Sequence, residues 1–558
     1  MTFRSVLTAI AALALALAPA AAAGTVVAYP SAQTIPTIGA LPQGSSATVT
    51  LNAARGEREG AWIVVTGIQG RMVSASIDGY QLGSLQAALY FGHFVESGGR
   101  TRPDALMPWD GKPQPTEKRN QPMYLQVVVP DDAKPGGYRA TVHVTADGIS
   151  YDVPVEITVF PVRLPAPDAT KGNLLTAFHV VPQSYVKEAG ELYHFRTNAQ
   201  RSAANESLFR FLSAYRISPA SWGFGEPRSA AGYTASSKWW LDAAGNMIRQ
   251  NENGFATMRI PISNQRTSAA SRIAGLSPFA PDSWCPYLQS VRNFWERNGW
   301  LTGHIPYLYA LDEPSLAGMG LVGRQAASAH SCFPGSKVLV TGNPSPSNRF
   351  LWDNRERDDV DIWVVLSRRY YGQFNGPRGR LASIQKARHA GKSIWSYTFH
   401  GVEGTPGYAL TEPLSDPRMF LLWNALEGIS GTLYGQGVTS YYSDDVFQGL
   451  RSRGEFVLVY PGEHTPIASA RLEQIRDGIE DWDLLNILRR KHGPTAVRRI
   501  LGDAGLFSTT ASGVILACST GCELDSPRRY SWPQWSHDAA TAAKIEAAHL
   551  RALQAASR

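Results

Sequence analysis

Short apolar strands alternate with helical runs through the middle of the chain, and this alternation limits the fold more than any other feature. The predicted strands are Leu174–Val181, Pro219–Gly223, Phe255–Ile262, Ile305–Leu311, Lys337–Thr341, Asp361–Leu366, Ser393–Phe399 and Gly431–Tyr434. The helical runs between them are Ala199–Tyr215, Trp284–Asn298, Leu321–Cys332, Leu381–His389 and Asp416–Glu427. Strands and helices alternating over this length predict a (β/α)8, TIM-like barrel. A doubly wound open sheet is the alternative.

The fourth predicted strand ends in two adjacent carboxylates and a proline. Ile305–Leu311 is apolar and aromatic, and Asp312, Glu313 and Pro314 follow it directly. Barrel enzymes carry their catalytic residues at the C-terminal ends of the strands. Two carboxyl groups in one cleft can hold different protonation states, which suits acid/base chemistry. Asp312 and Glu313 are therefore candidate catalytic residues, and a loop acid pair that caps the next helix is the alternative.

Other polar and aromatic side chains fall near the ends of the predicted strands. They are His179, Trp222, Asn343, Tyr397, His400, Tyr434 and Gln436. If the barrel closes, these residues converge around the two acids.

The rest of the chain has a different pattern. From Gly24 to about Leu164 it reads as short β-strands separated by turns, which predicts a β-sandwich, with Arg55–Glu59 as a solvated loop. A proline-rich linker, Arg163–Gly172, follows. Ser469–Leu488 has the spacing of an amphipathic helix, and Ala539–Ala556 predicts another. The predicted division is a signal peptide at 1–23, a β-sandwich domain at 24–165, a catalytic barrel at 173–490 and a small C-terminal helical appendix at 491–558.

The first residues predict export. Arg4 precedes the apolar run Val6–Leu17, and small residues up to Ala23 offer a cleavage site. An uncleaved anchor is the alternative. A periplasmic or extracellular location without stable membrane insertion follows, because no later segment is apolar for long enough to span a bilayer. The net charge of +7 is scattered and no nucleic-acid motif is present, so no nucleic-acid partner is expected.

The four cysteines fit an oxidising compartment. Cys518 and Cys522 are candidates for a local disulfide, and Cys285 and Cys332 for a second one. A zinc site is the alternative, but no matching His/Cys spacing accompanies them.

Three motifs stand out: the strand that ends in Asp312-Glu313-Pro314, the segment Lys392–Thr398 with Arg418 and Trp423 on the next helix, and the segment Arg471–Trp482. Together they resemble the catalytic region of glycoside hydrolase family 123, whose known activity is β-N-acetylgalactosaminidase. Arg55–Glu57, Pro135–Tyr138 and Phe160–Pro165 also resemble that family's β-sandwich. The resemblance extends to about residue 490.

The resemblance implies a secreted hydrolase that acts on β-linked N-acetylhexosaminides of a glycan or glycoconjugate, with no metal or cofactor. It also implies substrate-assisted retention through an oxazolinium ion, in which Asp312 orients the 2-acetamido group and Glu313 is the general acid and base. Trp395, Arg418 and Trp423 then join His179, Tyr397 and Tyr434 as predicted substrate-binding residues. The alternatives are a glycosidase of the same fold for a non-acetamido sugar, or a non-catalytic carbohydrate-binding surface protein.

Overall fold

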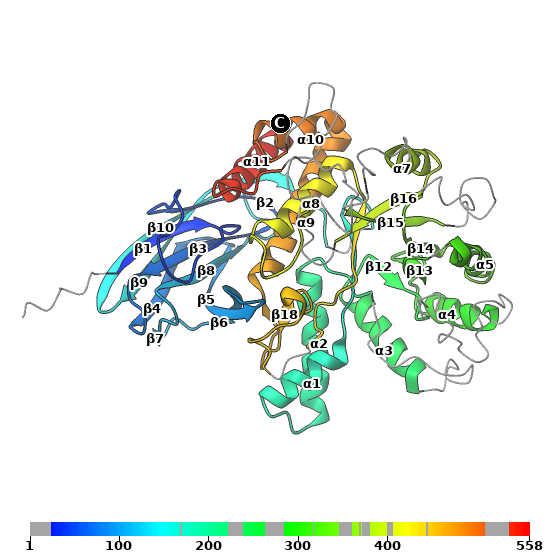
Figure 1. Cartoon of the computed structure of the whole chain (residues 1–558), viewed down its shortest axis with the longest axis horizontal. Coiled ribbons are helices and arrows are strands. Elements are labelled where there is room, and N and C mark those ends of the chain that lie inside the picture. Colours follow the sequence, from blue (N-terminus) through cyan, green and yellow to red (C-terminus); the bar gives the residue numbers. More distant parts are fainter. Residues whose placement is uncertain are drawn as a thin grey trace, which may run out of the picture.

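The computed structural model describes residues 24–167, 170–220, 238–262, 284–314, 316–344, 360–367, 370, 380–398, 405–441, 445–507 and 535–558. Two antiparallel-rich sheets form one end of the molecule, and a parallel sheet surrounded by helices forms the other (Figure 1). Helices α8 to α11 lie between the two ends. No helix in the described ranges combines the length and apolar character that a membrane span requires.

The N-terminal end is a β-sandwich, as predicted. One five-stranded sheet has the order β1 (Thr25–Pro30), β3 (Arg58–Thr66), β8 (Asn120–Val128), β5 (Gln86–Ser97) and β6 (Arg100–Pro108). The other has the order β2 (Val49–Arg55), β10 (Ile149–Arg163), β9 (Gly136–Ala146), β4 (Met72–Gln81) and β7 (Gln114–Pro115). Alternate residues of β10, from Val153 to Val159, are buried, and they join side chains of the facing sheet in one core.

The second sheet is parallel and nearly closed. Its order is β11 (Leu175–Phe178), β17 (Gly431–Tyr434), β16 (Ser393–Tyr397), β15 (Ile362–Leu366), β14 (Lys337–Thr341), β13 (Ile305–Leu311) and β12 (Thr257–Arg259). These are seven of the eight predicted strands. The first strand pairs with the last one, from Leu175–Gly431 to Phe178–Tyr434. A doubly wound open sheet has no such pairing, so a TIM-like arrangement fits better.

The gap in this sheet lies between β11 and β12, where the second predicted strand belongs. Phe178 forms a parallel bridge with Pro219, and the Thr257 hydroxyl donates a hydrogen bond to the Thr176 carbonyl. Of the strand predicted at Pro219–Gly223, only Pro219 and Ala220 are among the described residues, and this bridge is the part of it that forms there. The sheet is therefore a nearly closed barrel of seven strands, and the predicted eighth full strand is not found within the described ranges.

Helices cover the outside of the parallel sheet. They are α1 (Pro182–Leu192), α2 (Asn198–Ala214), α3 (Lys238–Glu252), α4 (Cys285–Arg297), α5 (Leu316–Cys332), α7 (Arg380–His389) and α8 (Asp416–Glu427). A disulfide joins Cys285, at the start of α4, to Cys332, at the end of α5, which confirms this predicted pair. Cys518 and Cys522 lie outside the described residues. A short pair, β18 (Val459–Tyr460) and β19 (Ile467–Ala468), follows the 3-10 turn η5 (Ser452–Gly454).

Helix α9 (Ala470–His492) lies between the sandwich and the barrel, and its polar residues are buried along with its apolar ones. Every residue from Ala470 to Leu485 is buried, so the predicted amphipathic helix has no solvent-facing side over this length. Its polar side meets polar groups of the sandwich instead. The Gln126 side chain on β8, for example, donates to both carboxylate oxygens of Glu473 at 3.0 Å.

The C-terminal helices complete this interface. α10 (Pro494–Asp503) packs against α8 and α9, whereas α11 (Thr541–Ala556) packs against α9 and against β1, β2 and β10 of the sandwich. Glu57 and Glu59 are 1% and 2% exposed, and the His549 ring on α11 lies within 3.7 and 3.4 Å of their carboxylates. The expectation of a solvated loop at Arg55–Glu59 is therefore wrong, because a cation from a distant helix covers its acids.

Three carboxyl groups lie close together near the start of α8 and the segment after η5: those of Asp416 and Glu455, which are buried, and that of Glu412, which is half-buried. Burial, and then the neighbouring Asp416 and Glu455 carboxyl groups, raise the pKa of Glu412 well above its ordinary value. Burial also raises the pKa of Asp416 from 3.8 to about 8, and its Oδ1 has no hydrogen-bond partner among the described residues. Uncompensated burial favours the neutral acid, so Asp416 keeps its proton in the folded chain.

We expect Asp416 to make the folded chain less stable as pH rises. The unfolded carboxyl group titrates near pH ~4, whereas the folded one titrates near pH 8. Between these values the folded state binds more protons, so the free energy of unfolding falls as pH rises. In Asp416→Asn the decrease in the free energy of unfolding between pH 5 and pH 8 should be smaller by at least about 1.4 kcal/mol, the equivalent of one pKa unit. Urea unfolding of both proteins at pH 5 and pH 8 measures it, and equal falls would contradict the assignment.

Candidate active site

Asp312 faces the mouth of the barrel because β13 carries a bulge just before it. Tyr309 belongs to the apolar cluster inside the barrel, whereas Ala310 and Leu311, adjacent in sequence, both belong to the core outside it. The pairing of β13 with β14 shifts between Tyr309 and Leu311. Strict alternation along the strand would have placed Asp312 on the outer face. The extra residue returns Asp312 to the inner face.

Two hydroxyl groups hold the Asp312 carboxylate. Tyr309 donates to Oδ1 at 3.0 Å, and Thr341, the last residue of β14, donates to the same oxygen at 3.1 Å. Burial, and then the neighbouring Asp312 carboxylate, raise the pKa of Tyr309 well above its ordinary value. Tyr309 therefore keeps its proton and remains a donor. The two donors fix the orientation of a carboxylate that is only partly buried.

Glu313 reaches the same mouth through an unusual backbone conformation. Its φ is +44°, in the left-handed region, which costs a non-glycine residue about 1–2 kcal/mol. Pro314 follows and disfavours the right-handed helical conformation at Glu313. The Glu313 N–H donates to the Thr341 hydroxyl at 2.6 Å. An extended backbone at Glu313 would have continued the alternation and turned the two acids to opposite faces.

The Glu313 side chain is exposed and meets Tyr397, the last residue of β16. The Tyr397 hydroxyl donates a short hydrogen bond to Glu313 Oε1. The structure thus brings together three of the residues predicted for the site: Asp312, Glu313 and Tyr397. Asp312 and Glu313 follow β13 and Tyr397 ends β16, two strands that are far apart in the sequence but end at the same edge of the parallel sheet.

His179 and Arg259 form a polar group near these residues. The Arg259 guanidinium lies 5.4 Å from the Tyr309 ring centroid and donates to the Ala220 and Ile262 carbonyls at 2.8 and 3.0 Å. Burial, and then the Arg259 charge, lower the pKa of His179 to about 4. Its imidazole is therefore neutral at ordinary pH. Its Nδ1 is buried and has no hydrogen-bond partner among the described residues.

Two other predicted binding residues lie in the core. Trp395 is fully buried inside the barrel, with its ring 6.4 Å from that of Tyr307. Tyr434 is fully buried on the outer side of the sheet, where it packs against Phe178 and donates to the Glu455 carbonyl at 2.7 Å. Tyr434 is the last residue of β17, whereas Trp395 lies in the middle of β16 and pairs with Gly431, the first residue of β17.

The structure does not bring Arg418 and Trp423 to the acids. Both side chains are 0% exposed, so neither is accessible to a sugar. Arg418 on α8 pairs with Asp481 at 2.7 Å and with Asp477 at 3.6 Å, both on α9. Trp423 packs in the outer core. The two residues join α8 to its neighbours, chiefly α9, against which α8 packs.

Of the remaining strand-end residues, Asn343 follows β14 and Gln436 follows β17, whereas Trp222 and His400 lie outside the described residues. Three residues of the site were missed by the sequence argument: Tyr309, Thr341 and Arg259. Each occupies the last or an inward position of a strand that enters the barrel mouth. That position is the signal that could have identified them.

A separate cluster of Glu57, Glu59 and His549 has the composition of a metal site, and its ligand atoms lie within 4.8 Å of one another. Burial alone would lower the pKa of His549, but Glu57, Glu59 and Asp481 raise it well above its ordinary value. One ring nitrogen donates to the Asn52 carbonyl at 3.0 Å, and the other lies 2.8 Å from Asp481. The imidazole is therefore a cation with acceptors on both nitrogens, which suits an ion pair rather than a metal.

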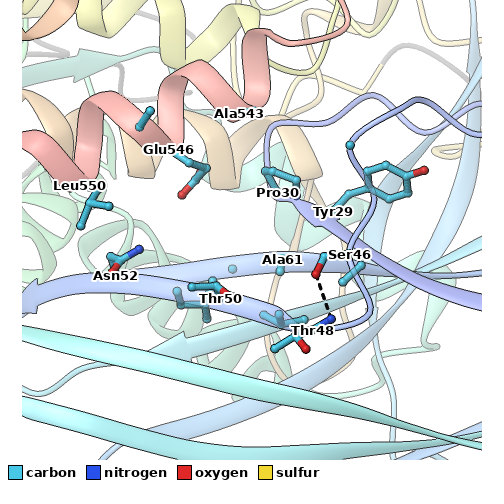
Figure 2. Close-up of a pocket in the computed structure, with 16 residues that line it drawn as sticks. Tyr29, Pro30, Ser46, Thr48, Thr50, Asn52, Ala61, Ala543, Glu546 and Leu550 are labelled. Carbon is cyan, nitrogen blue, oxygen red and sulfur yellow. Dashed lines mark hydrogen bonds between the residues drawn. The ribbon is translucent and has the colours of Figure 1, made fainter. Parts of the chain in front are cut away.

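A solvent-accessible pocket of about 300 Å³ lies between the sandwich and α11 (Figure 2). Its lining is mostly small or apolar, including Ala61, Ala543 and Leu550, and the Glu546 side chain projects into it. The Glu546 carboxylate lies 3.3 Å from the Arg418 guanidinium. This pocket is formed without any of the strand ends that carry Asp312 and Glu313, so it is not the candidate active site.

Comparison with known proteins gives one family match and similar solved structures. Residues 230–488 match the family model described as glycoside hydrolase 123, catalytic domain. A solved structure of a family 123 glycoside hydrolase from Clostridium perfringens, described for glycolipid glycan hydrolysis, has a TM-score of 0.63 at 13% identity and covers 96% of this chain and 98% of its own. A putative α-galactosidase from Bacteroides fragilis has a TM-score of 0.29 at 9% identity, over 78% of this chain and 77% of its own. None of the curated proteins matches the chain in sequence.

Proposed function

We propose that the chain hydrolyses β-linked N-acetylgalactosaminides with help from the substrate's own acetamido group, and that residues 230–488, which match the glycoside hydrolase 123 catalytic domain, are its catalytic domain. The observation that carries the proposal is the pairing of Asp312 and Glu313 at one barrel mouth. They are consecutive residues that a regular strand would have separated, and a bulge and a left-handed residue turn both inward.

In the first step the 2-acetamido oxygen attacks the anomeric carbon, and the bond from that carbon to the glycosidic oxygen breaks. Glu313 gives its proton to the departing oxygen. Asp312 accepts a hydrogen bond from the acetamido N–H and stabilises the positive charge that develops as the oxazolinium ring closes. The hydroxyls of Tyr309 and Thr341 hold that carboxylate in place.

In the second step water attacks the anomeric carbon from the face that the leaving group vacated. Glu313, now ionised, takes a proton from the water, and the oxazolinium opens to restore the acetamido group. The two inversions give net retention of the β configuration. Tyr397 donates to one oxygen of Glu313, so the other oxygen can carry the proton in both steps.

The proposed substrate class is a glycan or glycoconjugate that ends in such a sugar. The family supports it, and the description of the Clostridium perfringens enzyme concerns the glycans of glycolipids. The imidazole of His179, a predicted substrate-binding residue, is neutral, which suits a neutral sugar.

A panel of aryl glycosides tests the proposal. The purified chain should hydrolyse the aryl 2-acetamido-2-deoxy-β-galactoside fastest, and Asp312→Asn should lose about 10²-fold or more in kcat while it keeps the wild-type melting temperature. Inactivity of the folded wild-type chain on every sugar of the panel would favour a non-catalytic carbohydrate-binding protein. Full activity of Asp312→Asn would remove its role in the reaction.

A further inference from the structure

We propose that Thr341 is a positioning residue that sets the geometry of both acids through one hydroxyl group. The inference rests on the proposed function, because it assigns Thr341 a role only through Asp312 and Glu313. Thr341 is 1% exposed, so it acts on the substrate through these neighbours rather than by contact.

The hydrogen bonds around this hydroxyl have a fixed direction. The Glu313 peptide nitrogen can donate a hydrogen bond but cannot accept one, so the threonine oxygen is the acceptor in the 2.6 Å bond. The single hydroxyl proton is then available for Asp312 Oδ1, at 3.1 Å. The backbone of one acid is thereby linked to the carboxylate of the other, and a shift in either one is transmitted to its neighbour.

Glu313 needs this link more than an ordinary residue does. A non-glycine residue in the left-handed region persists only where its surroundings hold it there. At Glu313 a net hydrogen bond and the strain of the left-handed conformation are of similar size, so loss of the bond can shift the backbone. Pro314 disfavours the right-handed alternative, which leaves the extended conformation as the main competitor. That conformation would turn Glu313 away from Tyr397.

β14 suits Thr341 to this role. Thr341 ends a strand that pairs with β13 on one side and with β15 on the other, so its Cα is fixed by the sheet. The register shift in β13 brings residues 312 and 313 across from this strand end. The bulge and the threonine therefore act together: the bulge selects the face for Asp312, and the hydroxyl holds the turn that follows.

Three variants test the proposal: Thr341→Val, which removes the hydroxyl at nearly constant shape, Thr341→Ser, which keeps it, and Thr257→Val as a matched control. Thr257 is a buried threonine on β12 that donates to the Thr176 carbonyl at 2.7 Å. Rates are measured on whichever aryl glycoside the wild-type chain hydrolyses fastest, so that an error in the proposed sugar does not affect the result.

We expect Thr341→Val to lower kcat by about 10²-fold, as a misplacement of roughly 1 Å can, and to change KM by less than about 3-fold. Thr341→Ser should recover at least about a tenth of the wild-type kcat, and Thr257→Val should keep it. Should Thr341→Val fail to fold, Thr341→Ala takes its place. Wild-type kcat in a folded Thr341→Val or Thr341→Ala chain, or an equal loss in Thr257→Val, would overturn the proposal.

Crystal structures give a readout that needs no activity. In the Thr341→Val crystal, Glu313 should leave the left-handed region and lose its hydrogen bond to Tyr397, whereas in Thr341→Ser both should remain. An unchanged Glu313 backbone in the valine variant would refute the positioning role even if the chain hydrolyses the expected sugar. Conversely, a displaced Glu313 in a chain that is inactive on the whole panel would support the positioning role and reject only the proposed activity.

Discussion

Replacing the 2-acetamido group of an aryl β-galactosaminide by a hydroxyl group is expected to lower kcat/KM by at least about 10⁵-fold. The acetamido oxygen is the proposed nucleophile, so its removal deletes a reacting group as well as a binding contact. A well-held intramolecular nucleophile can contribute about 7–11 kcal/mol to lowering the barrier. A lost pocket contact contributes only about 1–3 kcal/mol. The size of the loss therefore separates the two roles.

The measurement compares two substrates that differ only at C2 and carry the same leaving group. A thiazoline analogue of the oxazolinium should inhibit the wild-type chain tightly, because analogues of high-energy intermediates bind better than substrates do. Asp312→Asn should bind that inhibitor more weakly. Similar rates on the two substrates, or a covalent sugar–enzyme adduct trapped during turnover, would point instead to a carboxylate nucleophile and a non-acetamido sugar.

The parallel sheet was predictable because its strands carry strong local signals. Ile305–Leu311 and Gly431–Tyr434 appear in the structure with the predicted bounds. Both are short, apolar and followed by a polar or turn residue, which is the pattern of a strand buried on two faces. The pairing of Cys285 with Cys332 was predictable for a similar reason, because both flank the same strand and helix unit.

The site was predictable only in part. The pair Asp312-Glu313 follows an apolar strand, and that position alone marks it. The bulge at Ala310–Leu311 and the left-handed Glu313 leave no mark in the sequence, because each depends on how β14 lies beside β13. Thr341 was missed for the same reason. Its role exists only once the two strands are side by side.

Buried charge was the least predictable feature. Helical spacing at residues 469–488 indicated a polar side, and polar sides usually face water. Here that side faces the sandwich and is buried. Within the helix itself, Arg476 pairs with Glu473 and Asp477 at 2.5 Å. Arg418 was expected to bind sugar because of its place in a family motif, but its partner Asp481 comes from another motif of the family, Arg471–Trp482. A motif that identifies a family can mark its internal packing as well as its active site.

Glu313→Gln is expected to lower the rate on a substrate with a poor leaving group by about 10²–10⁴-fold. Glutamine keeps the size of the side chain and can still accept the hydrogen bond from Tyr397, but it has no proton to transfer. The departing oxygen of a natural glycan needs that proton, whereas dinitrophenolate leaves without it. The loss in the first step should therefore shrink as the leaving group improves, so the slope of log rate against leaving-group pKa should become steeper in the variant.

The second step gives this prediction its internal control. Water still needs a base to attack the oxazolinium, so Glu313→Gln should accumulate the intermediate when the leaving group is dinitrophenolate, and a burst of product should precede a slow steady state. Azide needs no deprotonation, so added azide should raise the steady-state rate and yield the β-glycosyl azide. If the first step is slowed equally for good and poor leaving groups, Glu313 is not the general acid. If azide has no effect despite a burst, it is not the base, and a different residue must activate the water.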